Sequence, residues 1–215
     1  MATSCFIDHL AVTAPTLEAG VAFVEAALGV RLQPGGQHQR MGTHNRLLRL
    51  GESLYLEVIA PDPGLPRPTR PRWFGLDELP ASAPPRLATW VARCSDVHAA
   101  LAAATEDLGE PTPMERAALQ WLITIPADGR LRLGGLAPSL IQWQVPQHPA
   151  AGLADAGCSL VQLEARTPEP RRLEALLASL GLQAAVVVSA CPAEQAPQLV
   201  AHIDTPGGRR ALGAS

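Results

Sequence analysis

Three segments of the chain repeat one order of hydrophobic and polar positions: a short apolar run, an apolar stripe at helical spacing, and a closing glycine. In the first segment, Phe6–Thr13 is typical of a strand. Thr16 is suited to cap the start of a helix, and Gly29 is suited to end it. The apolar stripe between them consists of Leu17, Val21, Val24 and Leu28. This segment therefore predicts a strand followed by an amphipathic helix.

The same order returns at residues 87–109 and 159–181. Asp96 is the expected helix start in the second segment, and Pro168 is the expected start in the third. The two stripes are Val97, Leu101 and Leu108, and Leu173, Leu176, Leu177 and Leu180. The distance from start signal to closing glycine is the same in all three segments, and each predicted helix ends in Leu-Gly. This regularity indicates an internal repeat.

Further extended runs follow each helix, so that each unit is predicted to be βαβββ. These runs are residues 30–33, 45–50 and 54–60, then 119–125 and 140–145, then 185–188 and 199–203. The predicted fold class is α+β, in which helices cover one face of mostly antiparallel, mixed sheets and the other face curves into a cup.

The expected organisation is a first module at 1–61, a second at 86–146 and a third, βαβββ-like module at 157–215, packed as one unit. The Pro-rich stretch 62–85 reads as a linker or a surface excursion. The pattern leaves open which two modules pair.

Composition narrows the class of protein. The 215 residues are 47% hydrophobic, which is enough for a sizeable core. Only 17% are charged and the net charge is −3, so neither nucleic acid nor an anionic membrane is a favoured partner. No apolar stretch approaches the roughly 20 residues of a membrane span, and no signal peptide is apparent. Cys5, Cys94, Cys158 and Cys191 form no CxxC pair, which favours reduced thiols and a cytoplasmic location.

Four motifs of the first unit carry a family resemblance: residues 7–12 (IDHLAV), 17–20 (LEAG), 42–45 (GTHN) and 55–61 (YLEVIAP). With the βαβββ repeats, they resemble the glyoxalase-like branch of the vicinal-oxygen-chelate superfamily. The resemblance implies a cupped sheet in which the His of the first strand and the Glu of the fourth are metal ligands. The matching residues are His9 and Glu57, and the implied cofactor is a divalent ion such as Zn, Fe, Mn or Ni.

Strand alternation supports pairing these two residues. His9 is expected to share a face with Ile7 and Ala11, and Glu57 to share one with Tyr55 and Ile59. A buried carboxylate is costly without a partner, so Glu57 should meet a metal, a cation or a hydrogen-bond donor. Arg46 or Arg49 across the hairpin would be an alternative partner.

Other ligands and binding groups are less clearly indicated. At matching positions the second unit offers Thr89 and Gln142, which are weak ligands for transition metals. His44 is then the nearest third ligand and, with Glu57, a candidate catalytic residue; His148 and His202 are remoter options. The candidate substrate-binding residues are Asn45, Tyr55, Gln142 and Trp73, the last forming a lid together with Phe74.

Two functions follow from these expectations. The first is a metal-dependent enzyme of lyase, isomerase or dioxygenase type, acting on a small molecule with adjacent oxygens. The alternative is a non-catalytic small-molecule-binding protein of the same fold without a catalytic metal. A further hypothesis is that the unpaired third unit completes its sheet with a second copy of the chain, as a homodimer.

Overall fold

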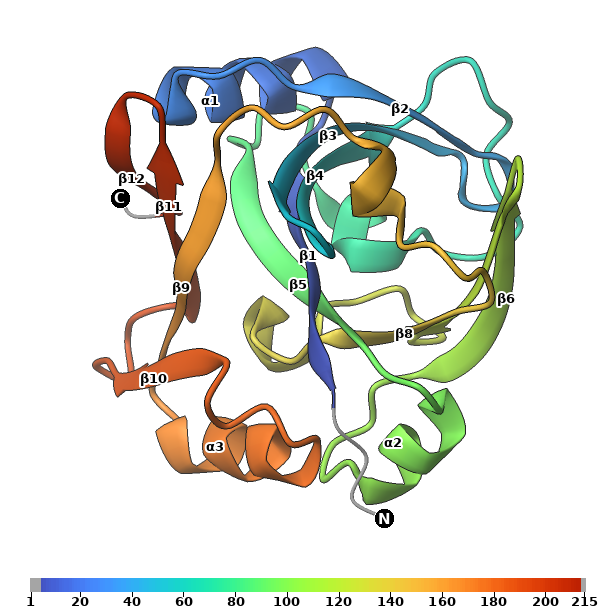
Figure 1. The fold of residues 1–215 in the computed structure, drawn as a ribbon. Helices are drawn as coiled ribbons and strands as arrows, with labels where there is room; N and C mark the ends of the chain where they lie inside the picture. The colour runs from blue at the N-terminus through green and yellow to red at the C-terminus, as the bar shows by residue number, and fades with distance from the viewer. Residues whose placement is uncertain (1–4, 214–215) are drawn as a thin grey trace.

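A large curled sheet dominates the computed structural model, which describes residues 5–213. Its eight strands lie in the order β2-β3-β4-β1-β5-β8-β7-β6 (Figure 1). In chain order they are β1 (Phe6–Thr13), β2 (Gln33–His38), β3 (Thr43–Gly51), β4 (Leu54–Pro61), β5 (Arg86–Arg93), β6 (Glu110–Arg116), β7 (Leu119–Ile125) and β8 (Ser139–Trp143). The fold is α+β, as predicted.

The first and second units pair through their first strands. β1 and β5 run antiparallel at the centre of the sheet, and each is flanked by the last strand of its own unit, β4 or β8, in parallel. The sheet curls until its two edges, β2 and β6, meet without pairing (Figure 1). At this seam Arg40 Nη1, just beyond β2, donates to Pro113 O of β6 at 2.8 Å. The result is a cup built from two modules.

The third unit forms a separate four-stranded sheet in the order β10-β9-β11-β12. Its strands are β9 (Ser159–Thr167), β10 (Val186–Ala190), β11 (Gln198–Thr205) and β12 (Gly208–Leu212). The order along the chain is again a strand, a helix and three strands. The pairing differs, because the strand after the helix, β10, lies directly beside β9 in parallel, whereas β2 lies at an edge, away from β1. The third unit is therefore not a copy of the cup-forming modules.

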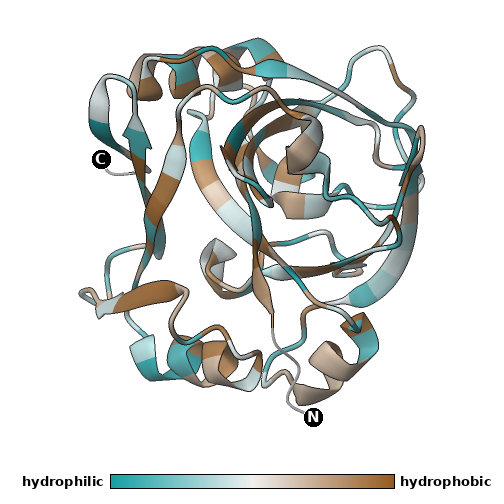
Figure 2. Ribbon diagram, viewed as in Figure 1, coloured by the Kyte–Doolittle hydropathy of each residue, from teal (hydrophilic) through white to brown (hydrophobic). Residues whose placement is uncertain are grey.

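Two of the three helices begin at their predicted capping residues, and one of these two ends early. In α1 (Leu17–Leu28), Thr16 Oγ1 accepts from Ala19 N, and Gly29 adopts the left-handed conformation at φ 71°. Asp96 caps α2 (Val97–Ala103), which is much shorter than the predicted helix ending at Gly109. α3 (Pro170–Ser179) begins after Glu169 rather than at Pro168. Brown and teal segments alternate along α1 and α3, as expected for helices with one buried side (Figure 2).

Two parts of the first unit differ from expectation. The strand predicted at 30–33 lies instead at β2, because the polar, glycine-rich run from Gln33 to His38 pairs with β3. The Pro-rich excursion contains a kinked 3₁₀ segment, η2 (Trp73–Glu78), that buries Trp73 and Phe74. Phe74 has φ 56°, a left-handed conformation that is unusual for an aromatic residue. The excursion therefore contributes to the core rather than merely linking modules.

Apolar side chains gather on both faces of the large sheet. One cluster joins the outer face to the helices and to the third unit, and includes Leu10, Val12, Leu56 and Val58. The other fills the cup and includes Ala11, Ile59, Trp73, Trp121 and Ile141. Within residues 5–213, no helix has the length and apolar character needed to cross a membrane.

Candidate active site

The cup holds a buried aspartate–histidine pair on β1. His9 Nδ1 lies 2.7 Å from Asp8 Oδ1, although neighbouring side chains of a regular strand point to opposite faces. A β-bulge explains the contact: Ile7 pairs with Ala92 and His9 with Val91, so that Asp8 is an extra residue opposite β5. Ile7 consequently packs with the outer cluster instead of sharing a face with His9.

Asp8 is fully buried and fixed by three donors. Besides His9, Trp143 Nε1 donates to Asp8 Oδ2 at 2.8 Å, and His148 Nε2 lies 2.9 Å from the same oxygen. The tautomer of His148 follows from its surroundings: its Nδ1 accepts from Ala150 N, so Nε2 carries the hydrogen. Burial acts to raise the pKa of Asp8, but the hydrogen bonds from His148 and His9, together with the charge of His9, hold it well below its usual range. Asp8 is therefore a carboxylate.

His9 turns its other nitrogen toward Glu57 of β4. His9 Nε2 and Glu57 Oε2 are 3.6 Å apart, and both side chains are buried. The ring of Tyr55 stacks on the imidazole with 4.6 Å between centroids, and Asn45 Nδ2 donates to Glu57 Oε1 at 2.5 Å. The partner that a buried Glu57 requires is thus the Asn45 amide rather than Arg46 or Arg49, whose guanidinium groups donate to backbone carbonyls.

Arg116 brings a positive charge to the same place from the end of β6. Its Nη1 lies 3.3 Å from His38 Nε2 and 3.4 Å from Asn45 Oδ1. Burial, followed by the charges of Arg116 and His9, lowers the pKa of His38 to about 3. His38 is therefore neutral at physiological pH; Nε2 accepts from Arg116 and Nδ1 donates to Thr43 Oγ1, 3.2 Å away.

Aromatic and aliphatic side chains close the cavity around these polar groups. Its volume is about 30 Å³, and its apolar lining includes Trp73, Phe74, Trp121, Ile141 and Trp143. Trp73 is only 4% exposed, and its indole N–H has no hydrogen-bond partner among the described residues. Burial also raises the pKa of Tyr55 well above its ordinary value, with the charges of Asp8 and Glu57 acting in the same direction. The Tyr55 hydroxyl therefore stays protonated.

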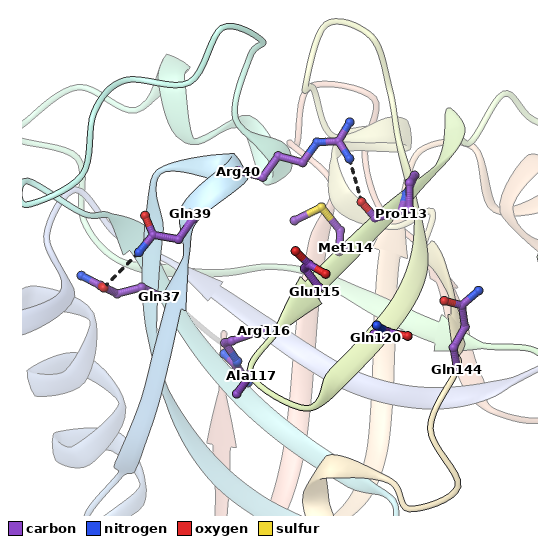
Figure 3. A pocket seen from close by; sticks show the side chains of 10 residues that line it. All are labelled: Gln37, Gln39, Arg40, Pro113, Met114, Glu115, Arg116, Ala117, Gln120 and Gln144. Carbon is purple, nitrogen blue, oxygen red and sulfur yellow. Dashed lines mark hydrogen bonds between the residues drawn. The ribbon is translucent and has the colours of Figure 1, made fainter.

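A larger, open groove lies outside the cavity, along the seam of the sheet. Its volume is about 930 Å³, and polar side chains dominate its lining, among them Gln37, Arg40, Glu115 and Gln120 (Figure 3). Arg116 lines both this groove and the inner cavity. The guanidinium group therefore stands at the boundary between the two spaces.

The predicted site residues divide into two groups. His9, Glu57, Asn45, Tyr55 and Trp73 all line the inner cavity. His44 does not, because it alternates with Asn45 on β3 and faces the opposite side of the sheet, where its Nδ1 lies 3.7 Å from Asp62 Oδ2.

Gln142 likewise lies outside the cavity. Its Oε1 accepts from Val97 N at 2.9 Å, so it caps the start of α2. The residues of β8 that face the cup are its neighbours, Ile141 and Trp143. His148 is near the site through Asp8, whereas His202 lies on the separate sheet beside Glu164.

Three polar residues of the site lay outside the sequence-based prediction: Asp8, His38 and Arg116. Asp8 carried a usable signal, because a carboxylate inside an apolar strand must find donors. His38 carried only a weak signal, as the end of the polar, glycine-rich run 33–38 that precedes His44 and Asn45. Arg116 carried none, because β6 lies far from the rest of the site in the sequence and has no apolar pattern.

Comparison with known proteins places this architecture in a family. The model of the glyoxalase-like domain family matches residues 7–181. A comparison with curated proteins gave no significant match.

Among solved structures, a variant of 4-hydroxymandelate synthase from Streptomyces coelicolor is 18% identical at a TM-score of 0.47, covering 99% of this chain and 63% of the synthase. A methylmalonyl-CoA epimerase variant from the same organism is 18% identical at 0.42, covering 65% and 98% of the two chains. The epimerase from Mycobacterium tuberculosis is 15% identical at 0.40, covering 64% and 86%.

The family match spans most of the chain and includes both cup-forming modules and the strand and helix that follow them. The chain belongs to the glyoxalase-like domain family.

Proposed function

We propose that this protein is an enzyme that transfers protons on a small molecule bound in the cup, with His9 and Glu57 carrying the protons. The observation that carries the proposal is the buried series Asp8–His9–Glu57, with distances of 2.7 Å and 3.6 Å between successive groups. A carboxylate on one imidazole nitrogen fixes the ring, so that the other nitrogen is directed at the reacting group.

The surroundings of the pair support acid–base work. Tyr55 stacks on the His9 ring and Asn45 holds one Glu57 oxygen, so both groups are oriented in advance. Abstraction of a proton next to a carbonyl and its return at a neighbouring atom need a group that accepts the carbon-bound proton, and a second group that exchanges a proton with the carbonyl oxygen assists the step. Glu57 and His9, side by side at 3.6 Å, supply both groups on one side of the bound molecule. Isomerase and lyase reactions on molecules with adjacent oxygens fit this arrangement.

The divalent metal implied by the family fits the donor set poorly. Within residues 5–213, no group of three His, Cys, Asp or Glu side chains lies close enough to hold a metal ion. Where the second module faces the cup it offers Thr89, Val91, Ile141 and Trp143, and the added charge is the guanidinium of Arg116. Neither a four-ligand zinc site nor a site of two His and one carboxylate is complete. The proposed proton transfer therefore uses protein groups alone, which favours isomerase or lyase chemistry over a dioxygenase.

Exchange in D₂O tests the proposal. Small 2-oxo acids, 2-hydroxy acids and hydroxyketones are incubated with the protein, and loss of carbon-bound hydrogen is followed by ¹H NMR. We expect exchange or conversion of at least one compound, and a drop of about 100-fold or more in Glu57→Gln and His9→Gln. His202→Gln is the matched control, because His202 also neighbours a glutamate, Glu164 at 3.4 Å, but on the other sheet. It should leave the rate unchanged.

Two results would overturn the proposal. Binding of these compounds without any exchange would identify the chain as the non-catalytic alternative. Stoichiometric divalent metal in the purified protein, lost in both His9→Ala and Glu57→Ala, would show that the pair is a metal site after all.

A further inference from the structure

We infer that the molecule taken by the cup carries a carboxylate group, which Arg116 and the Trp73 indole N–H bind, and that it enters from the groove at the seam. This inference rests on the proposed function only in taking the cup as the substrate site.

Arg116 has a charge that no acid neutralises. Its Nη1 contacts two neutral acceptors, His38 Nε2 at 3.3 Å and Asn45 Oδ1 at 3.4 Å. Within residues 5–213 it makes no ion pair, whereas Arg72, Arg130, Arg166 and Arg209 each lie within 3 Å of a carboxylate oxygen. A guanidinium offers five donors in a planar fork that matches a carboxylate. Arg116 therefore has unused capacity for an anion.

The Trp73 indole is a second unused donor in the same cavity. Its N–H is buried without a partner among the described residues, and a buried donor left unpaired costs about 1–3 kcal/mol. Trp143 provides the contrast, because its N–H in the same cavity is bonded to Asp8. Trp73 packs edge to face against His38 at 5.0 Å, and His38 in turn contacts Arg116. Trp73 and Arg116 therefore flank the same histidine and line the same cavity.

Asn45 keeps the catalytic carboxylate and the cation apart. Its Nδ2 donates to Glu57 Oε1, while its Oδ1 accepts from Gly36 N at 2.7 Å and faces Arg116. Glu57 consequently makes no ion pair with Arg116, and the guanidinium stays available to an incoming anion. A single amide thus divides the cavity into an acid–base end and an anion-binding end.

The position of Arg116 gives the route. It lies beside the β6–β7 turn, next to Ala117 at φ 51°, and lines the outer groove (Figure 3). Arg116 also lines the inner cavity. The inner cavity of about 30 Å³ holds roughly two water molecules, so a substrate needs more room. Moving the Arg116 side chain toward the groove enlarges the cavity and presents the guanidinium to an arriving anion. Trp121, Trp143 and Phe74 then line the space for an apolar or aromatic remainder.

Benzoate and benzamide are suitable probes because they share a shape and differ in charge. Three of the four tryptophans line the cavity, so binding is followed by intrinsic fluorescence and confirmed by calorimetry. We expect benzoate to bind and benzamide to bind about tenfold more weakly or worse. Arg116→Gln should weaken benzoate by about tenfold or more, and Trp73→Phe, which removes only the N–H, by a smaller factor. Arg210→Gln, on β12 of the other sheet, is the matched control, because Arg210 is exposed and lies outside the groove and the cavity, and it should leave the affinity unchanged.

Three outcomes would overturn the inference: equal binding of the two probes, unchanged benzoate affinity in Arg116→Gln, or no binding of benzoate, phenylacetate or pyruvate to the wild-type protein. Arg116→Lys keeps the positive charge but loses the planar, forked donors of the guanidinium. A benzoate affinity between those of the wild type and Arg116→Gln would show that Arg116→Gln weakens binding through lost recognition of the anion and not through misfolding. Benzoate binding through Arg116 in a protein that exchanges no protons contradicts the proposed function and leaves this inference standing.

Discussion

Asp8 and His9 are consecutive residues whose side chains are hydrogen-bonded across 2.7 Å, and this contact exists because β1 bulges at Asp8. In a regular strand the same two side chains would project to opposite faces of the sheet. The orientation of His9 Nε2 toward Glu57 thus depends on one irregular backbone position. Bulges of this kind are a common means of re-aiming a side chain beside a functional site.

Asp8→Asn should cost both stability and activity. The carboxylate accepts from His9, Trp143 and His148, and hydrogen bonds to charged groups contribute about 1.5–3 kcal/mol each, so we expect a loss of about 3 kcal/mol in urea unfolding. Proton exchange should fall about 100-fold or more as His9 loses its orientation. Asp155→Asn is the control, because Asp155 is exposed and only caps Gly157 N. Equal losses in the two variants would contradict the role of Asp8.

His38 should make the protein less stable in mild acid. Its pKa falls from 6.5 to about 3 on folding, so between these values the unfolded chain binds the extra proton and stability decreases as the pH falls. The contribution of His38 is complete above pH 6.5. Asp8, with an ordinary pKa of 3.8, and Glu106 and Glu164, with ordinary values of 4.5, also have lowered pKa values and act in the same direction, but only as the pH approaches those values. The interval from pH 6.5 to about 5 therefore reports mainly His38.

Denaturant unfolding across that interval measures the effect. One differential proton gives a slope of at most about 1.4 kcal/mol per pH unit, and His38→Gln should remove this contribution. If His38→Gln kept the wild-type slope of unfolding free energy against pH, a group other than His38 would be responsible for the slope.

Gly36→Ala should displace Arg116 without removing its charge. A Cβ at position 36 would come within 2.9 Å of Arg116 Cδ, and a flexible side chain can yield to it. We expect benzoate affinity to fall about three- to tenfold at nearly unchanged stability, within the range of a single hydrogen bond. Gly152→Ala is the control, since a Cβ there meets nothing within 4 Å. Equal benzoate affinity in the two variants would show that the Arg116 side chain does not lie against Gly36 when benzoate binds.

Phe74→Ala tests whether the excursion over the cup belongs to the core. Phe74 is buried at 6% exposure and stacks on Trp73 with 5.5 Å between centroids. Loss of a buried Phe costs about 3–5 kcal/mol. Phe6→Ala is the matched control, because Phe6 is 57% exposed and should cost less than about 1 kcal/mol. A loss of less than about 1 kcal/mol in the free energy of unfolding of Phe74→Ala would show that η2 contributes little to the packing of the core.

Helix starts could be predicted from the sequence because their signals are local. Thr16 and Asp96 cap the helices they were expected to cap. The end of α2 could not be predicted, because Leu108 continues the apolar spacing but is buried from the irregular segment between α2 and β6, outside the helix. The apolar spacing predicts which side chains are buried, but it does not show whether the backbone at each of these positions is helical.

The site was predictable where strands are regular. Period-two alternation links Tyr55 to Glu57, and both line the cavity. Choosing between His44 and Asn45 required the register of β3, which only its pairing with β4 supplies. Arg116 and His38 are 78 positions apart in the chain, and they meet only because the sheet curls until its edges touch.

The contact between the unpaired edge strands β2 and β6 allows the width of the cup to change. β2 and β6 lie against each other without a backbone ladder, and side-chain contacts such as Arg40 to Pro113 hold them. Parting them breaks a few polar contacts that water can replace, whereas widening a closed barrel would break a row of backbone hydrogen bonds. The same walls can therefore fit molecules of different width while the strands bearing His9 and Glu57, at the centre of the sheet, stay in register.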